Sequence, residues 1–407
     1  MVGGNPRLTD MSSPTHSLDP QIPMWLRVFS WFAVVWAFVL IWWGAAVTTE
    51  DVGLAVPDWP FSFGQVNPEG WWSIPALQLE HGHRLVASGL GVVVVLLFAF
   101  HWWRAEPKAR MIGELLGLLG VLAVNVYGVQ RLTELLARSK GLKEQDMFDL
   151  AAQLDGSATT WWVLVAATWV MVLLWLWHSW RYRGWSRLVK LGALALILVV
   201  VQAELGGLRV VMMSDGYGAM HGVLGQSFFC LLLVMAMLAE PTSLLVRDSA
   251  VRKLRVMSGV LVALVLLQLV VGATIRHTQR QMLEATDIIT TGGSFLPDWS
   301  NTQLVVIFLH KMGAIAAFVV AIMLATTAVK SMVHGMRGLS SHAGWLVVLF
   351  CAQIGLGVSV LYFHTHAKFE FWITQFHVVN GLLILAMSVS VTVRSWRAYG
   401  STGELAR

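Results

Sequence analysis

An acid, an imidazole and a guanidinium stand close together at the start of one apolar segment. The motif is Glu80-x-x-His83-Arg84, and residues 92–100 after it are nearly all aliphatic or Phe. Residues three apart share one face of a helix, so we expect Glu80 and His83 to point the same way. Ionisable side chains in a membrane helix are costly, and they mark places that bind or react with something. The motif therefore predicts a functional site.

The composition indicates a polytopic membrane protein. Of the 407 residues, 57% are hydrophobic and only 13% are charged, which is too apolar for a soluble protein of this size. The net charge of +5 does not indicate nucleic-acid binding, because the basic residues lie in short loops between apolar segments. The predicted spans are 25–47, 81–103, 111–130, 159–180, 187–212, 217–239, 254–275, 303–329, 343–363 and 371–394, with 111–130 the weakest.

The basic loops predict the orientation of the chain. They include Arg104, Arg187, Arg252, Lys330 and Arg394. All of them share one side of the membrane if the spans alternate in direction, and the positive-inside rule makes that side cytoplasmic. We expect both polar tails, 1–24 and 396–407, on that side, and an opposite loop over 131–158.

A long-range repeat divides the chain. The paired landmarks are Thr48-Thr49 with Thr290-Thr291, Pro57-Asp58-Trp59 with Pro297-Asp298-Trp299, His83-Arg84 with His310-Lys311, Gln202 and Gly206 with Gln353 and Gly357, and His221 with His377. The repeat predicts an all-α fold of two four-helix bundles related by a pseudo-two-fold axis along the membrane normal. The N-terminal half is 25–103 with 187–240, and the C-terminal half is 252–395. Residues 104–186 have no counterpart and form an insertion with two hydrophobic helices.

Each half then offers two histidines at a similar depth in the membrane: His83 with His221, and His310 with His377. Imidazoles that face each other across a helix bundle are suited to ligate haem iron. A lone membrane histidine is as often a structural residue as a ligand, but four that are paired by a repeat favour ligands. A zinc site is disfavoured, because no Cys or carboxylate completes a tetrahedral set in the second half.

Four cations lie at the level of these histidines. Arg84 and Lys311 directly follow a histidine, and Arg209 and Arg276 end outward-running helices. Guanidinium groups bind carboxylates bidentately, so we predict that these four side chains bind haem propionates. The alternative is that they only reach the membrane interface, and for Lys311 the two interpretations are balanced.

Together these motifs resemble the heme A synthase family. The motifs are Glu80-x-x-His83-Arg84, Pro57-Asp58-Trp59, Gln202-x-x-x-Gly206-Gly207, His221-Gly222-x-x-x-Gln226, His310-Lys311 and His377-x-x-x-Gly381. The resemblance covers 25–103 and 187–395. It implies an enzyme that oxidises the C8 methyl group of heme O to a formyl group, giving heme A for cytochrome oxidase. Glu80 matches an acidic residue that is implicated in catalysis in this family.

The same resemblance implies the cofactors and the location. The C-terminal half would hold haem b through His310 and His377, and the N-terminal half would hold substrate heme O or product heme A through His83 and His221. It implies a bacterial cytoplasmic (inner) membrane, with the haem sites toward the outer side. Besides heme O and membrane lipid, we expect an electron donor that the sequence does not identify. Heme O synthase, oxidase assembly factors and a second copy of the chain are candidate partners.

Two features depart from the family pattern, and the iron coordination adds an expectation about the mechanism. Many bacterial members carry a cysteine pair in the first outer loop, whereas residues 56–64 contain none here. The insertion 104–186 is also unusual, and we leave packing, oligomerisation and partner docking open as its role. Because bis-histidine iron has no open position for oxygen, we expect one N-terminal ligand to leave during turnover.

Two other classes of protein compete with an enzyme. One is a di-haem b-type electron-transfer protein, and the other is a transporter built from parallel repeats. Glu80 argues against the electron carrier, because the place three residues before His310 is occupied by Ile307. The spans also lack the matched Gly/Pro breaks that are expected of a transporter.

Overall fold

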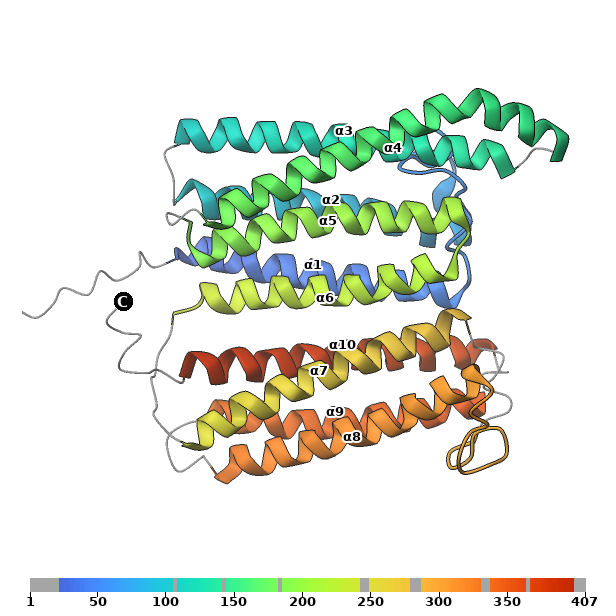
Figure 1. The fold of residues 1–407 in the computed structure, drawn as a ribbon. Coiled ribbons are helices and arrows are strands. Elements are labelled where there is room, and N and C mark those ends of the chain that lie inside the picture. The colour runs from blue at the N-terminus through green and yellow to red at the C-terminus, as the bar shows by residue number, and fades with distance from the viewer. Residues whose placement is uncertain are drawn as a thin grey trace, which may run out of the picture.

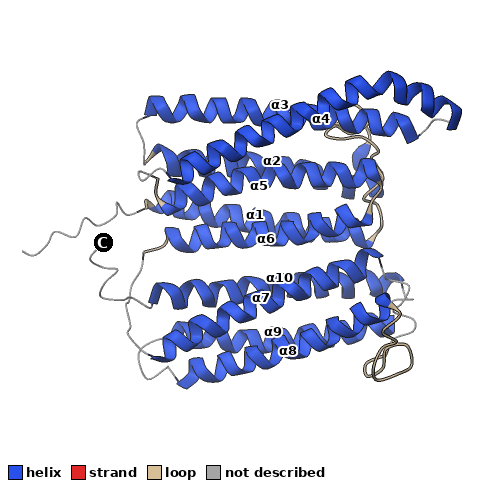
Figure 2. Cartoon of the chain, in the orientation of Figure 1, coloured by secondary structure: helices blue, strands red, loops and turns tan. Residues whose placement is uncertain are grey.

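The computed structural model describes residues 22–104, 108–140, 144–181, 185–241, 249–278, 287–330, 337–363 and 367–398. Within these residues the fold is ten α-helices and one 3-10 turn, η1 (Trp71–Ser73), without strands (Figures 1 and 2). The helices are α1 (Met24–Thr49), α2 (Pro75–Trp103), α3 (Lys108–Lys140), α4 (Glu144–Arg181), α5 (Arg187–Met212), α6 (Asp215–Ala239), α7 (Ser249–Thr278), α8 (Thr302–Lys330), α9 (Arg337–Phe363) and α10 (Ala367–Ala398). Most of the two predicted tails lies outside the described residues.

All ten helices contain a segment that is long and apolar enough to cross a membrane, so the predicted polytopic all-α fold is confirmed. This includes the segment predicted to be weakest, which the structure extends to Met111–Leu132. Local sequence explains several helix ends. The side chain of Ser186 caps α5 by accepting the amide hydrogen of Val189, and Met213 ends α5 in the left-handed conformation at φ 49°.

The helices pack as two groups of four (Figure 1). In the first group α1 contacts α2, α2 contacts α5, α5 contacts α6, and α6 returns to α1. The second group closes in the same way through α7, α8, α9 and α10. The two groups meet where α1 and α6 contact α10 and where α6 contacts α7. The helices of the first group are therefore separated in sequence by the inserted α3 and α4.

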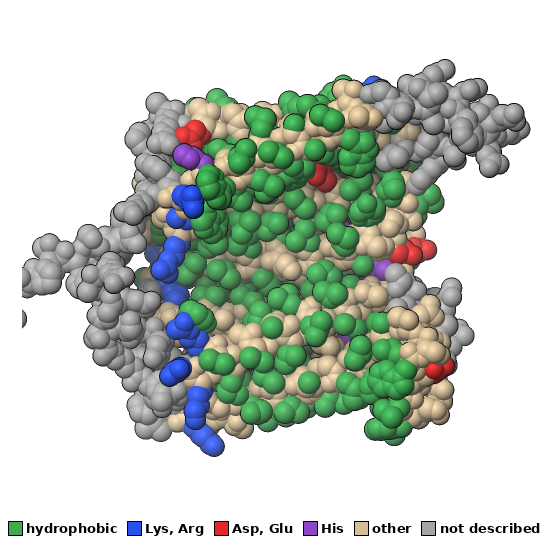
Figure 3. Space-filling model, in the orientation of Figure 1, with side chains coloured by type: hydrophobic (Ala, Val, Ile, Leu, Met, Phe, Trp, Pro, Cys, Tyr) green, Lys and Arg blue, Asp and Glu red, His purple; other side chains and the backbone are tan. Residues whose placement is uncertain are grey.

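Basic residues gather at one end of the bundle, where α4 and α8 end and α5 and α7 begin (Figure 3). Exposed members of this set are Arg181, Arg187, Arg252, Lys253 and Lys330. Apolar side chains cover the middle of the same face (Figure 3). Helix α1 begins and α10 ends at this basic end (Figure 1).

The inserted helices α3 and α4 pack against each other and on the α5 side of the first group. Asn125 is fully buried between them, and its amide nitrogen lies 2.6 Å from Oγ1 of Thr168. Trp175 of α4 packs on the buried Trp102 and Phe98 of α2. The connection predicted over 131–158 does separate the spans Met111–Leu132 and Thr159–Arg181, but much of it is helical, because α3 continues to Lys140 and α4 begins at Glu144. An amphipathic polar sequence can continue a helix beyond the apolar segment.

Candidate haem site

His83 on α2 and His221 on α6 face each other inside the first group of helices. Their ring centres are 6.4 Å apart, and the ring planes make an angle of 80°. A bond of about 2 Å from metal to nitrogen on each side, plus about 1 Å from nitrogen to ring centre, gives a separation of about 6 Å. The observed spacing therefore fits two imidazoles on one haem iron.

His221 is held in one orientation by α5. Its Nδ1 donates a hydrogen bond of 3.1 Å to the backbone carbonyl of Gln202. The side-chain amide of Gln202 donates back to the carbonyl of His221 at 3.2 Å. A proton on Nδ1 leaves Nε2 unprotonated, which is the form that binds a metal. The local structure thus prepares His221 as a ligand.

His310 on α8 and His377 on α10 form the second pair, and they lie close enough to interact electrostatically. The amide nitrogen of Gln353 is 3.1 Å from the carbonyl of His377 and 3.2 Å from its Nε2. Asn380 holds this amide in place by donating to its oxygen at 2.7 Å. Among the described residues no three His, Cys, Asp or Glu side chains are grouped to hold a metal ion.

Each of the four histidine rings packs against a glycine of the preceding helix of its group. A Cβ added to these glycines would approach the histidine Cε1 to 2.9 Å at Gly44 (His83), 3.4 Å at Gly206 (His221), 3.2 Å at Gly272 (His310) and 3.3 Å at Gly357 (His377). Sequence comparison of the halves found Gly206 and Gly357 but missed the other two. The spacing Gln268-x-x-x-Gly272 repeats that of Gln202 and Gly206, and it could have revealed Gly272 from the sequence.

Glu80 is buried on α2, with 5% of its surface exposed. Its Oε1 accepts a hydrogen bond of 3.0 Å from Nε of Arg84 and lies 3.0 Å from Nη2 of the same residue. Ile307, three residues before His310, is buried to the same degree at 3% exposed. The carboxylate next to the first histidine pair thus has an apolar counterpart next to the second.

Arg84 and Lys311 both fasten the preceding loop to the helix that carries a histidine. Arg84 donates through Nη1 to the carbonyls of Asp58 (2.6 Å) and Phe61 (2.8 Å). Lys311 donates through Nζ to the carbonyls of Asp287 (2.9 Å) and Thr290 (2.9 Å). In each loop the two carbonyls are three residues apart. The role of Arg84 and Lys311 in binding haem propionates stays a prediction. In this structure both cations already bind loop carbonyls.

These contacts correct the predicted register of the loop repeat. They pair Asp58 with Asp287, whereas the sequence comparison paired Pro57-Asp58-Trp59 with Pro297-Asp298-Trp299. Equivalent isolated bridges, Ser62 with Gln65 and Thr291 with Ser294, follow at the same interval. Thr48-Thr49 lies inside α1 and Thr290-Thr291 in the outer loop, so that pairing was also wrong. Short Pro-Asp-Trp motifs in loops of unequal length recur without marking the same place.

The two paired aspartates close their loops with the same kind of hydrogen bond. Asp58 accepts the amide hydrogens of Phe63 and Gly64, each at 2.7 Å. Asp287 accepts from the hydroxyl and amide of Thr290 and from the amide of Ile289. The Thr290 hydroxyl bond is the main cause that holds the pKa of Asp287 below its ordinary value.

Arg209 ends α5 of the first group and Arg276 ends α7 of the second group, both away from the basic end of the bundle. Arg276, on α7 of the second group, donates through Nη2 to the carbonyl of Ala45 (2.8 Å) and to Oγ1 of Thr49 (2.6 Å) on α1. The guanidinium of Arg209 lies against Gly53, where an added Cβ would come within 2.5 Å of Nη1. The structure thus brings Arg84 and Arg209 close to His83 of the first pair. Arg276 lies close to His377 of the second pair, and Lys311 follows His310 on α8.

Two neighbouring histidines have structural contacts instead of ligand geometry. The Nδ1 of buried His81 is 2.8 Å from the hydroxyl of Ser62, and its ring packs edge-on against Trp71. His277 packs on Gly218, where an added Cβ would lie 3.0 Å from its Cε1. His81 therefore fixes the loop between α1 and α2, and His277 joins α7 to α6.

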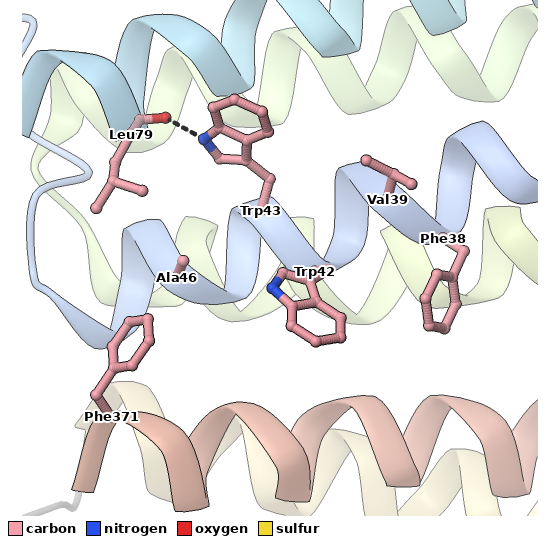
Figure 4. A pocket seen from close by; sticks show the side chains of 7 residues that line it. All are labelled: Phe38, Val39, Trp42, Trp43, Ala46, Leu79 and Phe371. Atoms are coloured by element: carbon pink, nitrogen blue, oxygen red, sulfur yellow. Dashed lines mark hydrogen bonds between the residues drawn. The ribbon is translucent and has the colours of Figure 1, made fainter. Parts of the chain in front are cut away.

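An apolar cavity of about 450 Å³ lies between α1, α2 and α10. It is lined by Phe38, Val39, Trp42, Trp43 and Ala46 of α1, Leu79 of α2 and Phe371 of α10 (Figure 4). The indole nitrogen of Trp43 donates to the carbonyl of Leu79 at 2.9 Å (Figure 4). Leu79 precedes Glu80 on α2, but neither Glu80 nor His83 lines the cavity.

The fold and the site define a class: a polytopic helical membrane protein with two pairs of membrane histidines, one of them spaced for a haem iron. Residues 160–389, more than half of the chain, match the sequence profile of the family COX15-CtaA, described as cytochrome oxidase assembly protein. The chain belongs to this family.

Three bacterial relatives, each named heme A synthase, are similar over shorter segments. The protein of Geobacillus thermodenitrificans is 39% identical over 89 residues, which is 21% of this chain and 27% of the relative. That of Halalkalibacterium halodurans is 31% identical over 115 residues, 25% of this chain and 37% of the relative. That of Chelativorans sp. (strain BNC1) is 24% identical over 143 residues, 29% of this chain and 38% of the relative. The matched segments thus cover well under half of each relative.

Proposed function

We propose that this protein is a heme A synthase, which oxidises the C8 methyl group of heme O to the formyl group of heme A for cytochrome oxidase. The single observation that carries the proposal is the asymmetry between the two histidine pairs. Glu80 is a buried carboxylate beside His83, and Ile307 takes its place beside His310. An electron carrier with two equivalent haems has no need of an acid at one of them, whereas an enzyme that changes one haem does. The names of the three relatives point the same way.

His83 and His221 hold the substrate haem, and His310 and His377 hold a haem b cofactor. The support for the first assignment is the ring separation of 6.4 Å and the unprotonated Nε2 that the Gln202 carbonyl imposes on His221. The support for the second assignment is that its packing repeats that of the first, because Gly272 and Gly357 lie against His310 and His377 as Gly44 and Gly206 lie against His83 and His221. Haem iron supplies the oxidising power for an unactivated methyl group, which no side chain possesses.

The chain itself positions the substrate and moves protons. Two hydroxylations of the methyl carbon would give a geminal diol, which loses water to leave the aldehyde. In each hydroxylation a C–H bond is replaced by C–OH with one atom of dioxygen, and the other oxygen atom leaves as water with two electrons from the electron donor and two protons. Glu80 accepts a proton or stabilises developing positive charge beside the reacting edge. Both contacts of Arg84 end on Oε1 of Glu80, so Oε2 is the atom that serves this role. Arg84 holds the carboxylate at that place and ties it to the outer loop.

We place the chain in a bacterial cytoplasmic membrane, with both termini cytoplasmic and the histidine pairs toward the outer side. The basic end of the bundle supports this orientation by the positive-inside rule (Figure 3). Heme O synthase, oxidase assembly factors, an electron donor and a second copy of the chain are proposed partners. Labelling of single cysteines placed in the outer loop near Asn67 and at Lys253 tests the orientation, and access from the same side would contradict it.

The test of the function is the identity of the bound haem. The full-length protein is purified from a strain that makes heme O, and its haems are extracted and identified by mass. We expect haem b together with heme O, heme A or a hydroxylated intermediate. Haem b alone at both pairs would contradict the proposal and favour the di-haem electron carrier.

A matched pair of variants tests the role of the carboxylate. Glu80→Gln should abolish formation of heme A while haem b stays at His310 and His377. Glu204→Gln is the control, because Glu204 is also a buried carboxylate, at 9% exposed, but it bonds to Trp169 of the insertion. Equal loss of conversion in both variants, or loss of all haem from Glu80→Gln, would make Glu80 a structural residue.

A further inference from the structure

The two histidines of the first pair are held with unequal firmness. His221 has its Nδ1 bonded to the Gln202 carbonyl and its own carbonyl bonded to the Gln202 amide. Nδ1 of His83 is buried and has no hydrogen-bond partner among the residues that the structure describes. Packing on Gly44 is the contact that positions the ring of His83 on the α1 side.

This difference changes how well each ring binds a metal. A hydrogen bond from Nδ1 to a carbonyl fixes the orientation of the ring and raises the basicity of Nε2. Such partners typically change metal affinity by about 10- to 100-fold. His221 has this support, and His83 lacks it. Of the two bonds to iron, the one from His83 is the weaker, so it is the one that breaks.

The position that His83 would leave is the one next to the acid. Glu80 is three residues before His83, on the same face of α2. Its carboxylate is buried and fixed by Arg84 at 3.0 Å. Glu204, the other buried carboxylate among the described residues, bonds instead to Trp169 of α4. An open coordination position on the His221 side would lie across the haem from Glu80.

We infer that His83 is the exchangeable axial ligand of the substrate haem and that His221 stays bound throughout turnover. This inference rests on the proposed function, because it assumes that a haem is bound between His83 and His221. In the exchange the bond between His83 Nε2 and iron breaks, the nitrogen keeps its electron pair, and a small diatomic ligand takes the vacant position beside Glu80. No electron is transferred in this step.

Carbon monoxide is the probe, because it binds reduced haem only where an axial position opens. The full-length protein carrying haem at both pairs is reduced without oxygen and exposed to carbon monoxide. A laser pulse then removes the carbon monoxide, and resonance Raman spectroscopy records the iron–histidine stretch of the remaining ligand. This stretch depends on the hydrogen bond at Nδ1, so it distinguishes His221 from His83 without any measurement of conversion.

Two variants provide the reference spectra. His83→Ala leaves only His221 at the first pair, and we expect its iron–histidine stretch to equal that of the unaltered protein after photolysis. We also expect carbon monoxide to bind its first haem at least about tenfold faster than in the unaltered protein. His221→Ala leaves only His83 and should give a different stretch and at least about tenfold weaker retention of the first haem. The spectrum of the haem at His310 and His377 reports folding in every case.

The outcomes separate this inference from the proposed function. A stretch in the unaltered protein that equals that of His221→Ala would show that His221 leaves, and would overturn the inference alone. A first haem that never binds carbon monoxide would overturn it as well. Absence of any haem at the first pair would overturn both proposals. Should either alanine variant lose the spectrum of the second haem, His83→Met and His221→Met take their place.

Discussion

The guanidinium of Arg84 and the carboxylate of Glu80 form a buried ion pair on one turn of α2, with Nη2 3.0 Å from Oε1. The exposed fractions of the two side chains are 13% and 6%. Removing one member of such a pair leaves an uncompensated charge in a place of low dielectric. The pair therefore holds Glu80 in place and stabilises the first group of helices.

We expect Arg84→Leu to lower the free energy of unfolding by about 3 kcal/mol, because it leaves Glu80 unpaired and frees the loop carbonyls of Asp58, Phe61 and Val56, the last of which accepts from Nη2 at 3.1 Å. Unfolding in detergent, followed by tryptophan fluorescence, measures this. The double variant Glu80→Leu/Arg84→Leu should be more stable than Arg84→Leu. Lys311→Leu is the control. It should lower the free energy of unfolding less, because the residue one turn before Lys311 is the apolar Ile307, so no carboxylate is left unpaired. A double variant less stable than Arg84→Leu would contradict the ion-pair argument.

The glycines beside the histidines should tolerate alanine unequally. Gly44→Ala places a Cβ within 2.9 Å of His83 Cε1, so the ring must move, whereas at Gly206 the distance to His221 is an ordinary 3.4 Å. We expect Gly44→Ala to lose most haem from the first pair and keep it at the second. Gly206→Ala should retain haem at both. Haem absorbance per protein measures this, and a greater loss from Gly206→Ala would be evidence against the packing described.

Arg276 should stabilise the contact between the two groups of helices. Arg276→Gln removes a charged donor from the Ala45 carbonyl and the Thr49 hydroxyl. One hydrogen bond of a charged group contributes about 1.5–3 kcal/mol. We expect a total loss of about this size, because the amide of Gln still offers a donor for one of the two acceptors. Thermal unfolding in detergent measures the loss. Arg252→Gln, at the exposed basic end, is the control and should change the midpoint little.

The stability of the loop closed by Asp287 should depend on pH only in the acid range. Its pKa is lowered in the folded protein, so the contribution of the ionised carboxylate is complete above the ordinary pKa and is lost as pH falls through the lowered one. We expect hydrogen-exchange protection of 287–294, corrected for the intrinsic rate, to be constant at neutral pH and to fall below about pH 4. Asp287→Asn should show weaker protection with no such step. A loss of protection near neutral pH would assign the step to another group.

The sequence by itself determined the class of protein, the ten spans, the four histidines and the acid beside one of them. These features depend on local composition and on periodic spacing, which act within one helix and need no knowledge of its neighbours. The same is true of the contrast between Glu80 and Ile307, which requires only an alignment of one helix with another.

Only the tertiary structure decided which groups meet. It showed that the rings of His83 and His221 are spaced for one iron, that Arg84 and Lys311 hold loop carbonyls, and that Arg276 reaches α1 from the other group. It also corrected the loop register and extended α3 and α4 into the expected loop. Such contacts join residues that are far apart in the chain, and loop lengths change without changing the contact, so spacing in one sequence does not encode them. The unequal support of His83 and His221 depends on the fold for the same reason. The Gln202 carbonyl, which bonds to His221 and not to His83, lies on another helix.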